Sequence, residues 1–394
     1  MEKIGNINCI YHGDCKEILK KISDNFYTGI LTDPPYGLSF MGKKWDYDVP
    51  DIETFRELLR VTKAGGYLFC FAGSRTQHRM AVNIEDAGWI IKDTIMWLYG
   101  CGFPKSYDIG KAIDAKILMG ASNTRNLRAI EQKFGGEEYE IKVPRNGIKN
   151  EIETWSRKRY ENQTELGTQF GGYGTALKPA YEPIIVAMKP HDETYAQNAI
   201  NHGVAGLNID DCRVEGGRWP ANVIHDGSDE VVENLPEQAK RFFYCAKASQ
   251  NEKNAGIAST EARKRDKARN INQPSQNGGS GTPYNRGSLV VRNFHPTVKP
   301  IALMEYLAKF LMMPENTKLL DPFMGSGTTL IACNRLNIDC DGIEQNKEYI
   351  ELAQARLAHY STTELEYEVD TSNSPIEKTQ LNIFDFLQEI SDDH

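Results

Sequence analysis

A short stretch near the start of the chain combines a carboxylate, two prolines and an aromatic residue. Asp33 follows a β-prone run, Tyr27 to Leu31, and is itself followed by Pro34, Pro35 and Tyr36. Each proline fixes its own φ and biases the preceding residue toward extended backbone, so the strand ends and no helix begins. The simplest alternative is a strand terminator. The functional interpretation is a stiff loop that presents a carboxylate, a carbonyl and a ring where α/β sheets bind ligands.

A second stretch, near the other end, has the pattern of a cofactor-binding turn. Residues 318–329 read Lys-Leu-Leu-Asp-Pro-Phe-Met-Gly-Ser-Gly-Thr-Thr, which predicts a buried strand, a glycine turn and a helix. Gly325 and Gly327 allow the backbone to approach a ligand, and the first amides of the helix favour polar or anionic groups. The next apolar strand, Ile338 to Glu344, ends in an acid placed like the ribose-binding acids of nucleotide folds. Alone, this turn leaves a dinucleotide enzyme open.

Together the two stretches resemble the motifs of amino-group DNA methyltransferases. Asp33 to Tyr36 resembles the catalytic motif, Phe323 to Gly327 resembles the cofactor motif, and their order along the chain is that of the β-class. His295 to Pro300 resembles the segment that precedes the cofactor strand in that class. Lys178 to Pro183 resembles a segment found in many of these enzymes.

The resemblance covers residues 5–100 and 292–358, matches the middle loosely, and implies roles for individual residues. The implied catalytic residues are Asp33, Pro34, Pro35 and Tyr36. The implied ligands of S-adenosylmethionine are Asp14, His295, Thr297, Lys299, Asp321, Phe323, Gly325, Ser326, Gly327, Thr328 and Glu344. Asp14 has an alternative role as the N-cap of a helix that begins at Cys15.

The chemistry implied by the resemblance is methyl transfer to an exocyclic amine of a flipped-out base. Asp33 and the Pro34 carbonyl would each accept an N–H of the amine, which favours a pyramidal, nucleophilic nitrogen, while Tyr36 offers a stacking face. An aspartate at the first position of the motif goes more often with adenine, so we expect N6 of adenine, with N4 of cytosine as the near alternative.

Three other functions account for less of the sequence. A protein-glutamine methyltransferase would have asparagine in place of Asp33 and a different motif order. A nicotinamide-dependent dehydrogenase leaves the Asp33 loop unexplained and lacks one glycine of the Rossmann fingerprint. A non-catalytic DNA-binding protein does not need two intact motifs.

The strand–helix–strand cadence between residues 52 and 98 indicates an α/β fold with helices on both faces of a sheet. The expected fold is a Rossmann-like methyltransferase sheet, mostly parallel, with one antiparallel strand, Pro183 to Met188, at its edge. The expected division is a catalytic half (1–100), an insert plus the edge strand (101–190), a target-recognition region (191–290), a cofactor half (291–360) and an acidic tail (361–394).

Composition favours a cytoplasmic protein without a metal. No run approaches ~18 apolar residues and Met1 is not followed by a signal-type segment, so we expect neither a membrane protein nor a secreted one. The eight cysteines form no C-x-x-C pair and no His/Cys cluster, which indicates reduced thiols and no metal site. The sequence leaves the oligomeric state, a homodimer included, undetermined.

The charge distribution is compatible with double-stranded DNA as partner despite a net charge of −8. From Asp341 onward there are 13 acidic and 3 basic residues, whereas between Lys253 and Lys299 there are 9 basic and 2 acidic ones. A local basic segment can supply phosphate contacts. The expected DNA-binding residues are Arg263, Lys264, Arg265, Lys267 and Arg269. No stretch indicates a nuclease domain, so we expect a standalone modification enzyme.

Overall fold

The structure is a computed structural model in which part of the chain is described. The described residues are 2–4, 8–38, 47–100, 102, 106–120, 127–136, 138–144, 152–158, 160–214, 216–233, 243–257, 263–264, 290–291, 293, 295 and 297–362. Contacts divide the chain into two units. The first comprises residues 1–101, 180–258 and 295–394, and the second comprises residues 102–179 and 259–294.

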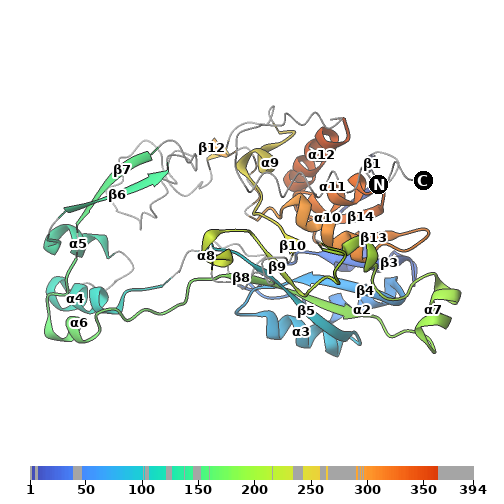
Figure 1. The fold of residues 1–394 in the computed structure, drawn as a ribbon, viewed down its shortest axis with the longest axis horizontal. Coiled ribbons are helices and arrows are strands. Elements are labelled where there is room, and N and C mark those ends of the chain that lie inside the picture. The colour runs from blue at the N-terminus through green and yellow to red at the C-terminus, as the bar shows by residue number, and fades with distance from the viewer. Residues whose placement is uncertain are drawn as a thin grey trace. The chain divides into compact units, whose positions relative to one another are not determined.

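The first unit is built on one twisted sheet in which the two ends of the chain meet (Figure 1). In spatial order its strands are β1 (Glu2–Ile4), β2 (Asn8–His12), β14 (Asp339–Glu344), β13 (Lys318–Asp321), β3 (Tyr27–Thr32), β4 (Thr62–Phe71), β8 (Tyr181–Met188), β5 (Ile90–Leu98), β9 (Val223–His225) and β10 (Phe243–Tyr244). From β2 to β4 neighbouring strands are parallel, β8 is antiparallel to both β4 and β5, and β1 is antiparallel to β2.

Helices cover both faces of this sheet. One buried cluster joins α1 (Cys15–Leu19), α2 (Ile52–Val61) and α3 (Gln77–Asp86) to side chains such as Ile30 and Leu68. The other joins α10 (Ile301–Phe310), α11 (Thr328–Arg335) and α12 (Lys347–Thr362) to Leu31 and Phe69. Alternate residues of β3 and β4 therefore face opposite layers, as the two-residue period of a strand requires.

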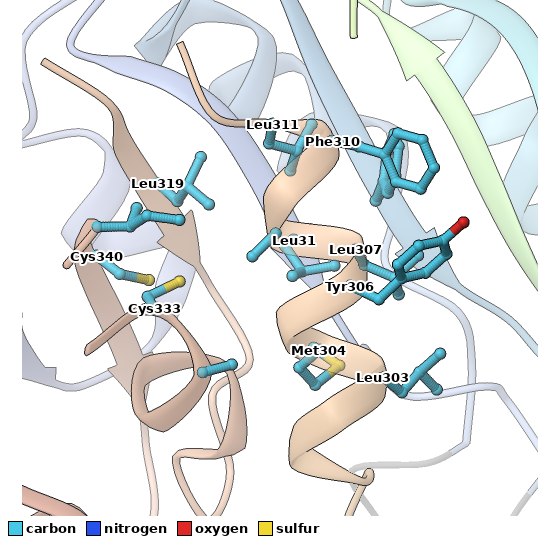
Figure 2. Packing of buried hydrophobic residues seen from close by; sticks show 14 of the residues in the cluster. Leu31, Leu303, Met304, Tyr306, Leu307, Phe310, Leu311, Leu319, Cys333 and Cys340 are labelled. Carbon is cyan, nitrogen blue, oxygen red and sulfur yellow. The ribbon is translucent and has the colours of Figure 1, made fainter. Parts of the chain in front are cut away.

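The α10 layer shows how the two halves of the chain are held together. Leu303, Met304 and Leu307 of α10 and Leu311, which directly follows it, belong to one buried cluster with Leu31 of β3 (Figure 2). All of them are almost completely excluded from water. Burying one leucine stabilises the fold by about 1.5–3 kcal/mol, so this layer alone fixes α10 firmly.

Shorter helices complete the first unit, and the second unit is described by itself. The remaining helices of the first unit are α7 (Tyr195–His202), the 3-10 helix η4 (Asp210–Cys212), α8 (Asp229–Val232) and α9 (Gln250–Asn254). The second unit contains α4 (Ile109–Met119), α5 (Arg128–Phe134), β6 (Glu138–Pro144), β7 (Ile152–Lys158), α6 (Glu165–Gln169), β11 (Arg263–Lys264) and β12 (Val290–Val291). Inside it, the buried Asp114 carboxylate accepts hydrogen bonds from Tyr160 and Thr164.

The expected fold class is confirmed, but one strand was misplaced. The strand predicted at Pro183–Met188 is antiparallel, yet β8 lies inside the sheet between β4 and β5 rather than at its edge. The strand is not an edge because β5 pairs along the whole length of β8. A second antiparallel strand, β1, also pairs with β2. The division into parts differs too, since β9 and β10 bring residues of the 191–290 region into the main sheet.

Candidate active site

The two sequence stretches that carry chemistry end at the same edge of the sheet. β3 and β13 are parallel neighbours, with Leu319 opposite Gly29 and Leu320 opposite Ile30. Asp33 follows the last residue of β3, and the turn at Gly325 follows the last residue of β13. The carboxyl ends of both strands therefore bring the acidic loop and the glycine turn together, as the ligand-binding edge of an open α/β sheet requires.

Both oxygens of the Asp33 carboxylate are engaged. The Tyr36 hydroxyl donates to Oδ1 at 2.6 Å, and the Lys299 ammonium donates to Oδ2 at 2.7 Å. Lys299 also donates to the Tyr36 hydroxyl at 3.1 Å. Among the described residues no donor reaches the Pro34 carbonyl, so that acceptor remains available at the same loop.

A second carboxylate completes this cluster. Glu182, at the start of β8, places Oε2 3.2 Å from Nζ of Lys299. The Lys299 side chain is 9% exposed, and its ammonium lies 4.7 Å from the centre of the Phe71 ring. Burial alone would lower the pKa of Lys299, but the charges of Asp33 and Glu182 raise it above its ordinary value. Lys299 is therefore a buried cation shared by two acids.

Tyr36 is held in the protonated form. Burial raises the pKa of Tyr36 well above its ordinary value, and the charges of Asp33 and Glu182 act in the same direction. Its hydroxyl consequently stays a donor to Asp33. The backbone carbonyl of Tyr36 accepts from the Thr76 hydroxyl at 2.6 Å, which ties the loop to the residue that precedes α3.

Asp321, at the end of β13, joins three elements from the inside. Its carboxylate accepts from the hydroxyls of Thr32 on β3 and Thr329 on α11, and from the Phe323 amide. Burial raises the pKa of Asp321 to about 6, against the hydrogen bonds, which lower it. With three internal donors, this acid stabilises the edge on which the site is built.

The glycine turn itself is shaped by Glu344 and His295. Gly325 has φ of +51°, and its amide donates to Oε2 of Glu344 at 3.2 Å. A Cβ at this position would come 2.5 Å from Nε2 of His295, so only glycine fits. His295 donates from Nδ1 to the Thr297 carbonyl at 2.8 Å, and burial lowers its pKa to about 4. A neutral imidazole therefore lies against the turn.

A buried arginine lies on the inner side of the turn. Arg356 of α12 is completely buried, and its Nη1 donates to the Ser326 carbonyl, the Ser326 hydroxyl and the Thr328 hydroxyl. Because these oxygens are bonded to α12, the hydroxyls of Ser326 and Thr328 face the interior of the protein rather than a ligand.

Comparison with known proteins gives this geometry a family. A family model of DNA methylases, the N6/N4 methyltransferases, matches residues 27–355. The chain belongs to this family. It is an S-adenosylmethionine-dependent DNA methyltransferase. The chain is 23% identical to the type II methyltransferase M.HindIII of Haemophilus influenzae, over 89% of this chain and 95% of that protein. A shorter match, 48% identical over 66 residues, is to M.HpaI of Haemophilus parainfluenzae and covers 17% of this chain and 21% of that one.

Solved methyltransferase structures are also similar. The M1.HpyAVI–SAM complex has a TM-score of 0.41 and 19% identity, and covers 89% of this chain and 99% of that one. The cytosine-N4-specific PvuII DNA methyltransferase has a TM-score of 0.45 and 12% identity, and covers 96% of this chain and 92% of that one.

The structure distributes the residues expected to bind the cofactor into two groups. Gly325, Glu344 and His295 surround the outer side of the turn, and Asp14 lies at the same edge, beyond the end of β2, which pairs with β14. Asp14 caps α1 by accepting from the Lys16 amide at 2.9 Å, as the capping alternative predicted. The inward-facing group is Asp321, Ser326 and Thr328, which are buried and bonded to other parts of the methyltransferase. Of the rest, Thr297 bonds His295 through its carbonyl, Phe323 bonds Asp321 through its amide, and Gly327 has φ of +77°.

Two residues that contact the acidic loop, Lys299 and Glu182, differ from the expected assignment. Lys299 was expected beside the cofactor, but its ammonium lies on Asp33, Tyr36 and Glu182 of the methyltransferase. Glu182 was not singled out at all. A signal was present, since Glu182 stands in the segment Lys178–Pro183 that resembles other family members. On an antiparallel strand the first residues, not the last, lie at the ligand-binding edge. Residues that follow a predicted strand therefore do not include Glu182.

The expected DNA-binding residues are only partly described. Arg263 and Lys264 form β11, whose backbone pairs with β12, while Arg265, Lys267 and Arg269 lie outside the described residues. The acidic tail beyond residue 362 also lies outside them. Within the described part of the chain there is no cluster of three metal-ligating side chains, and no helix is long and apolar enough to cross a membrane.

Proposed function

We propose that the protein transfers the methyl group of S-adenosylmethionine to the exocyclic N6 amine of adenine, in a base flipped out of double-stranded DNA. The observation that carries the proposal is the position of the Asp33 carboxylate and the Pro34 carbonyl at the edge shared with the glycine turn. An amine with two N–H groups requires two acceptors close together, and this loop supplies one carboxylate and one carbonyl.

The cofactor fits the outer side of the turn. The half-buried Glu344 carboxylate, at the end of β14, accepts from the amides of Gly325 and Asn346 and has further lone pairs for ribose hydroxyls. S-adenosylmethionine supplies an electrophilic methyl group on a sulfonium. The chain's own contribution is to hold Gly325 and His295 in place, to keep Asp33 as an acceptor, and to fix Tyr36 as a face for the base.

Adenine is favoured over cytosine by the aspartate at the first position of the catalytic motif. Both bases present an exocyclic amine beside a ring nitrogen, so the acceptor pair of the loop suits either one. Cytosine N4 is the second candidate for this reason, and the two differ in the product rather than in the mechanism.

The DNA approaches the edge at which the loop lies, and α3 offers positive charge there. Arg75, His78 and Arg79 are exposed around the start of α3, next to Thr76, which bonds the catalytic loop. No acidic residue stands in the first turn of α3. Cations at a helix N-terminus oppose the helix dipole, so folding alone does not favour them there. Phosphate groups beside the flipped nucleotide would favour positive charge at this position.

The relatives named as type II methyltransferases support a site-specific reaction on DNA, which extends the proposal to modification of one short sequence. Arg263, Lys264, Arg265, Lys267 and Arg269, in the second part of the chain, are proposed to contact the phosphates of that site. Sequence readout then comes from elsewhere in the region between residues 191 and 290.

Identification of the methylated nucleoside tests the proposal. DNA free of methylation is incubated with the protein and S-adenosylmethionine, digested to nucleosides and examined by mass spectrometry. N6-methyladenine is expected, and it should be absent when Asp33→Ala is used. N4-methylcytosine would establish the second candidate, and no methylated base under conditions in which the protein is folded would refute both.

A further inference from the structure

The cluster around Asp33 holds more charge than methyl transfer requires. Two carboxylates, Asp33 and Glu182, share one ammonium, that of Lys299. The Lys299 and Asp33 side chains are only 9% and 17% exposed, so the cation is shielded from water and its partners matter. One carboxylate is enough to neutralise a buried ammonium, so the second carboxylate is the feature to explain.

We propose that Lys299 and Glu182 form a positioning pair: Lys299 lies between the two carboxylates and holds Asp33 as an acceptor until the target amine arrives, and Glu182 then retains the displaced ammonium. The proposal rests on the function proposed above, because it requires Asp33 to accept an N–H from the base. It gives Lys299 a role at the catalytic loop rather than at the cofactor.

The geometry supports the exchange. Each Asp33 oxygen already accepts one hydrogen bond, from the Tyr36 hydroxyl at 2.6 Å and from the Lys299 ammonium at 2.7 Å, so an incoming amine competes with these two donors for the carboxylate. Replacing Lys299 exchanges one N–H donor for another and leaves Asp33 with the same number of hydrogen bonds. The ammonium can remain in place beside Glu182, whose Oε2 is 3.2 Å away, so no unpaired charge is left buried.

Charge explains why Lys299 is needed at all. Without it, Asp33 and Glu182 would be two carboxylates bridged by the Tyr36 hydroxyl, which lies 3.4 Å from Oε2 of Glu182. Like charges so placed raise the pKa of one carboxyl, and a protonated Asp33 offers a donor where an acceptor is required. Among the described residues, the other titratable groups near the cluster are Cys70 on β4, Asp321 on β13 and His295. Burial lowers the pKa of His295 to about 4, so its imidazole is neutral over the range from pH 5 to pH 9 and none of the three adds positive charge.

The test is the pH dependence of methyl transfer, measured as kcat and kcat/KM for DNA between pH 5 and pH 9 with radiolabelled cofactor. For Lys299→Met the acid limb of the profile should move upward by about one to three pH units, the usual effect of losing a neighbouring opposite charge. In Lys299→Met combined with Glu182→Gln the limb should move back, because the charge of Glu182 no longer lies beside Asp33. Glu182→Gln alone should lower kcat/KM without an upward shift, since Lys299 then has no second partner.

Three outcomes overturn the inference. The acid limb of Lys299→Met could coincide with that of the wild type. The acid limb of the double variant could also stay where it is in Lys299→Met. Lys299→Met could instead lose S-adenosylmethionine affinity in calorimetry while its pH profile stays unchanged, which would return Lys299 to the cofactor site.

Lys21→Met, an exposed lysine of the same unit, controls for loss of one charge, and thermal melting controls for folding. If Lys299→Met does not fold, Glu182→Gln still decides the matter, because unchanged kcat/KM at every pH would exclude a role for Glu182. Failure of the proposed function is distinguished by Asp33→Ala, which would then retain turnover.

Discussion

At the scale of single residues, the acceptor function of Asp33 separates from cofactor binding. Asp33 bonds Tyr36 and Lys299, whereas the glycine turn bonds Glu344 and lies against His295. We expect Asp33→Ala to lose at least a hundredfold in kcat, the size of effect that follows removal of one transition-state partner, and to keep its S-adenosylmethionine affinity. Single-turnover methyl transfer and calorimetry measure the two quantities. Near-normal turnover would reduce the loop to a strand terminator.

At the glycine turn we expect the opposite effect: a substitution at Gly325 should weaken cofactor binding. Gly325→Ala forces an L-residue to φ of +51°, at a cost of about 1–2 kcal/mol, and brings Cβ to 2.5 Å from Nε2 of His295. The turn must shift, so S-adenosylmethionine affinity should fall about tenfold or more. Gly203→Ala is the matched control, since its φ is +67° but no atom lies within 4 Å of the added Cβ. It should lose stability without losing cofactor affinity, and equal affinities in all three proteins would contradict the assignment.

At the scale of secondary-structure elements, Asp321 connects β13 with β3 and α11, and its titration has a definite sign. Its pKa of about 6 in the folded protein exceeds the ordinary value of 3.8, so the folded state binds the proton more tightly than the unfolded state. The contribution of Asp321 to stability is therefore greatest below pH 4 and declines as pH rises to about 6. Asp321→Asn should lack this decline, and Asp321→Ala should cost roughly 2–4 kcal/mol because Thr32, Thr329 and the Phe323 amide lose an acceptor. Urea unfolding at several pH values checks both, and parallel pH profiles for wild type and Asp321→Asn would rule the interpretation out.

The start of α3 carries a prediction about DNA. Arg75→Ala with Arg79→Ala should weaken binding to all duplexes and reduce the dependence of log K on log salt by about two units, one for each lost phosphate contact. Arg213→Ala with Arg218→Ala removes the same charge. These two arginines precede the first residue of β9, and Arg213 lies over the ring of the exposed Trp219. Fluorescence anisotropy across a salt series should separate the two pairs. Equal salt slopes for both would show that α3 does not contact phosphates.

These elements also show how far sequence reasoning reaches. The Asp33 loop and the Gly325 turn could be predicted because each depends on local rules: proline ends a strand, and glycine permits a tight turn. That the two meet at one edge of the sheet depends on the pairing of β3 with β13 and was not predicted. The interior position of β8 and the contact of Glu182 with Lys299 could not, because both depend on pairing between residues more than one hundred positions apart. Lys299 was expected beside the cofactor because of the motif in which it stands. Its ammonium instead contacts the carboxylates of Asp33 and Glu182, which the fold brings next to it.

At the scale of the whole molecule, charge is distributed unevenly along the chain rather than balanced within each part. The net charge of −8 comes from the last fifty residues, while the stretch from Lys253 to Lys299 is strongly basic. DNA is attracted by local potential and not by net charge, so an acidic protein can still bind it through one segment. The basic stretch supplies residues 259–294 to the second unit, whereas Lys299 belongs to the first.

The last prediction concerns this basic segment. Neutralising Arg263, Lys264 and Arg265 together should weaken binding to specific and unrelated duplexes alike, because phosphate contacts carry no sequence information. It should flatten the salt dependence of log K by up to about three units and leave the ratio of specific to non-specific affinity nearly unchanged. Anisotropy titrations of wild type, the triple variant and the Arg213/Arg218 control, each with a cognate and a scrambled duplex, measure slope and ratio together. A triple variant whose line overlays the wild-type line would show that the segment is a linker. A loss of affinity for the cognate duplex alone would show instead that the basic segment recognises the DNA sequence.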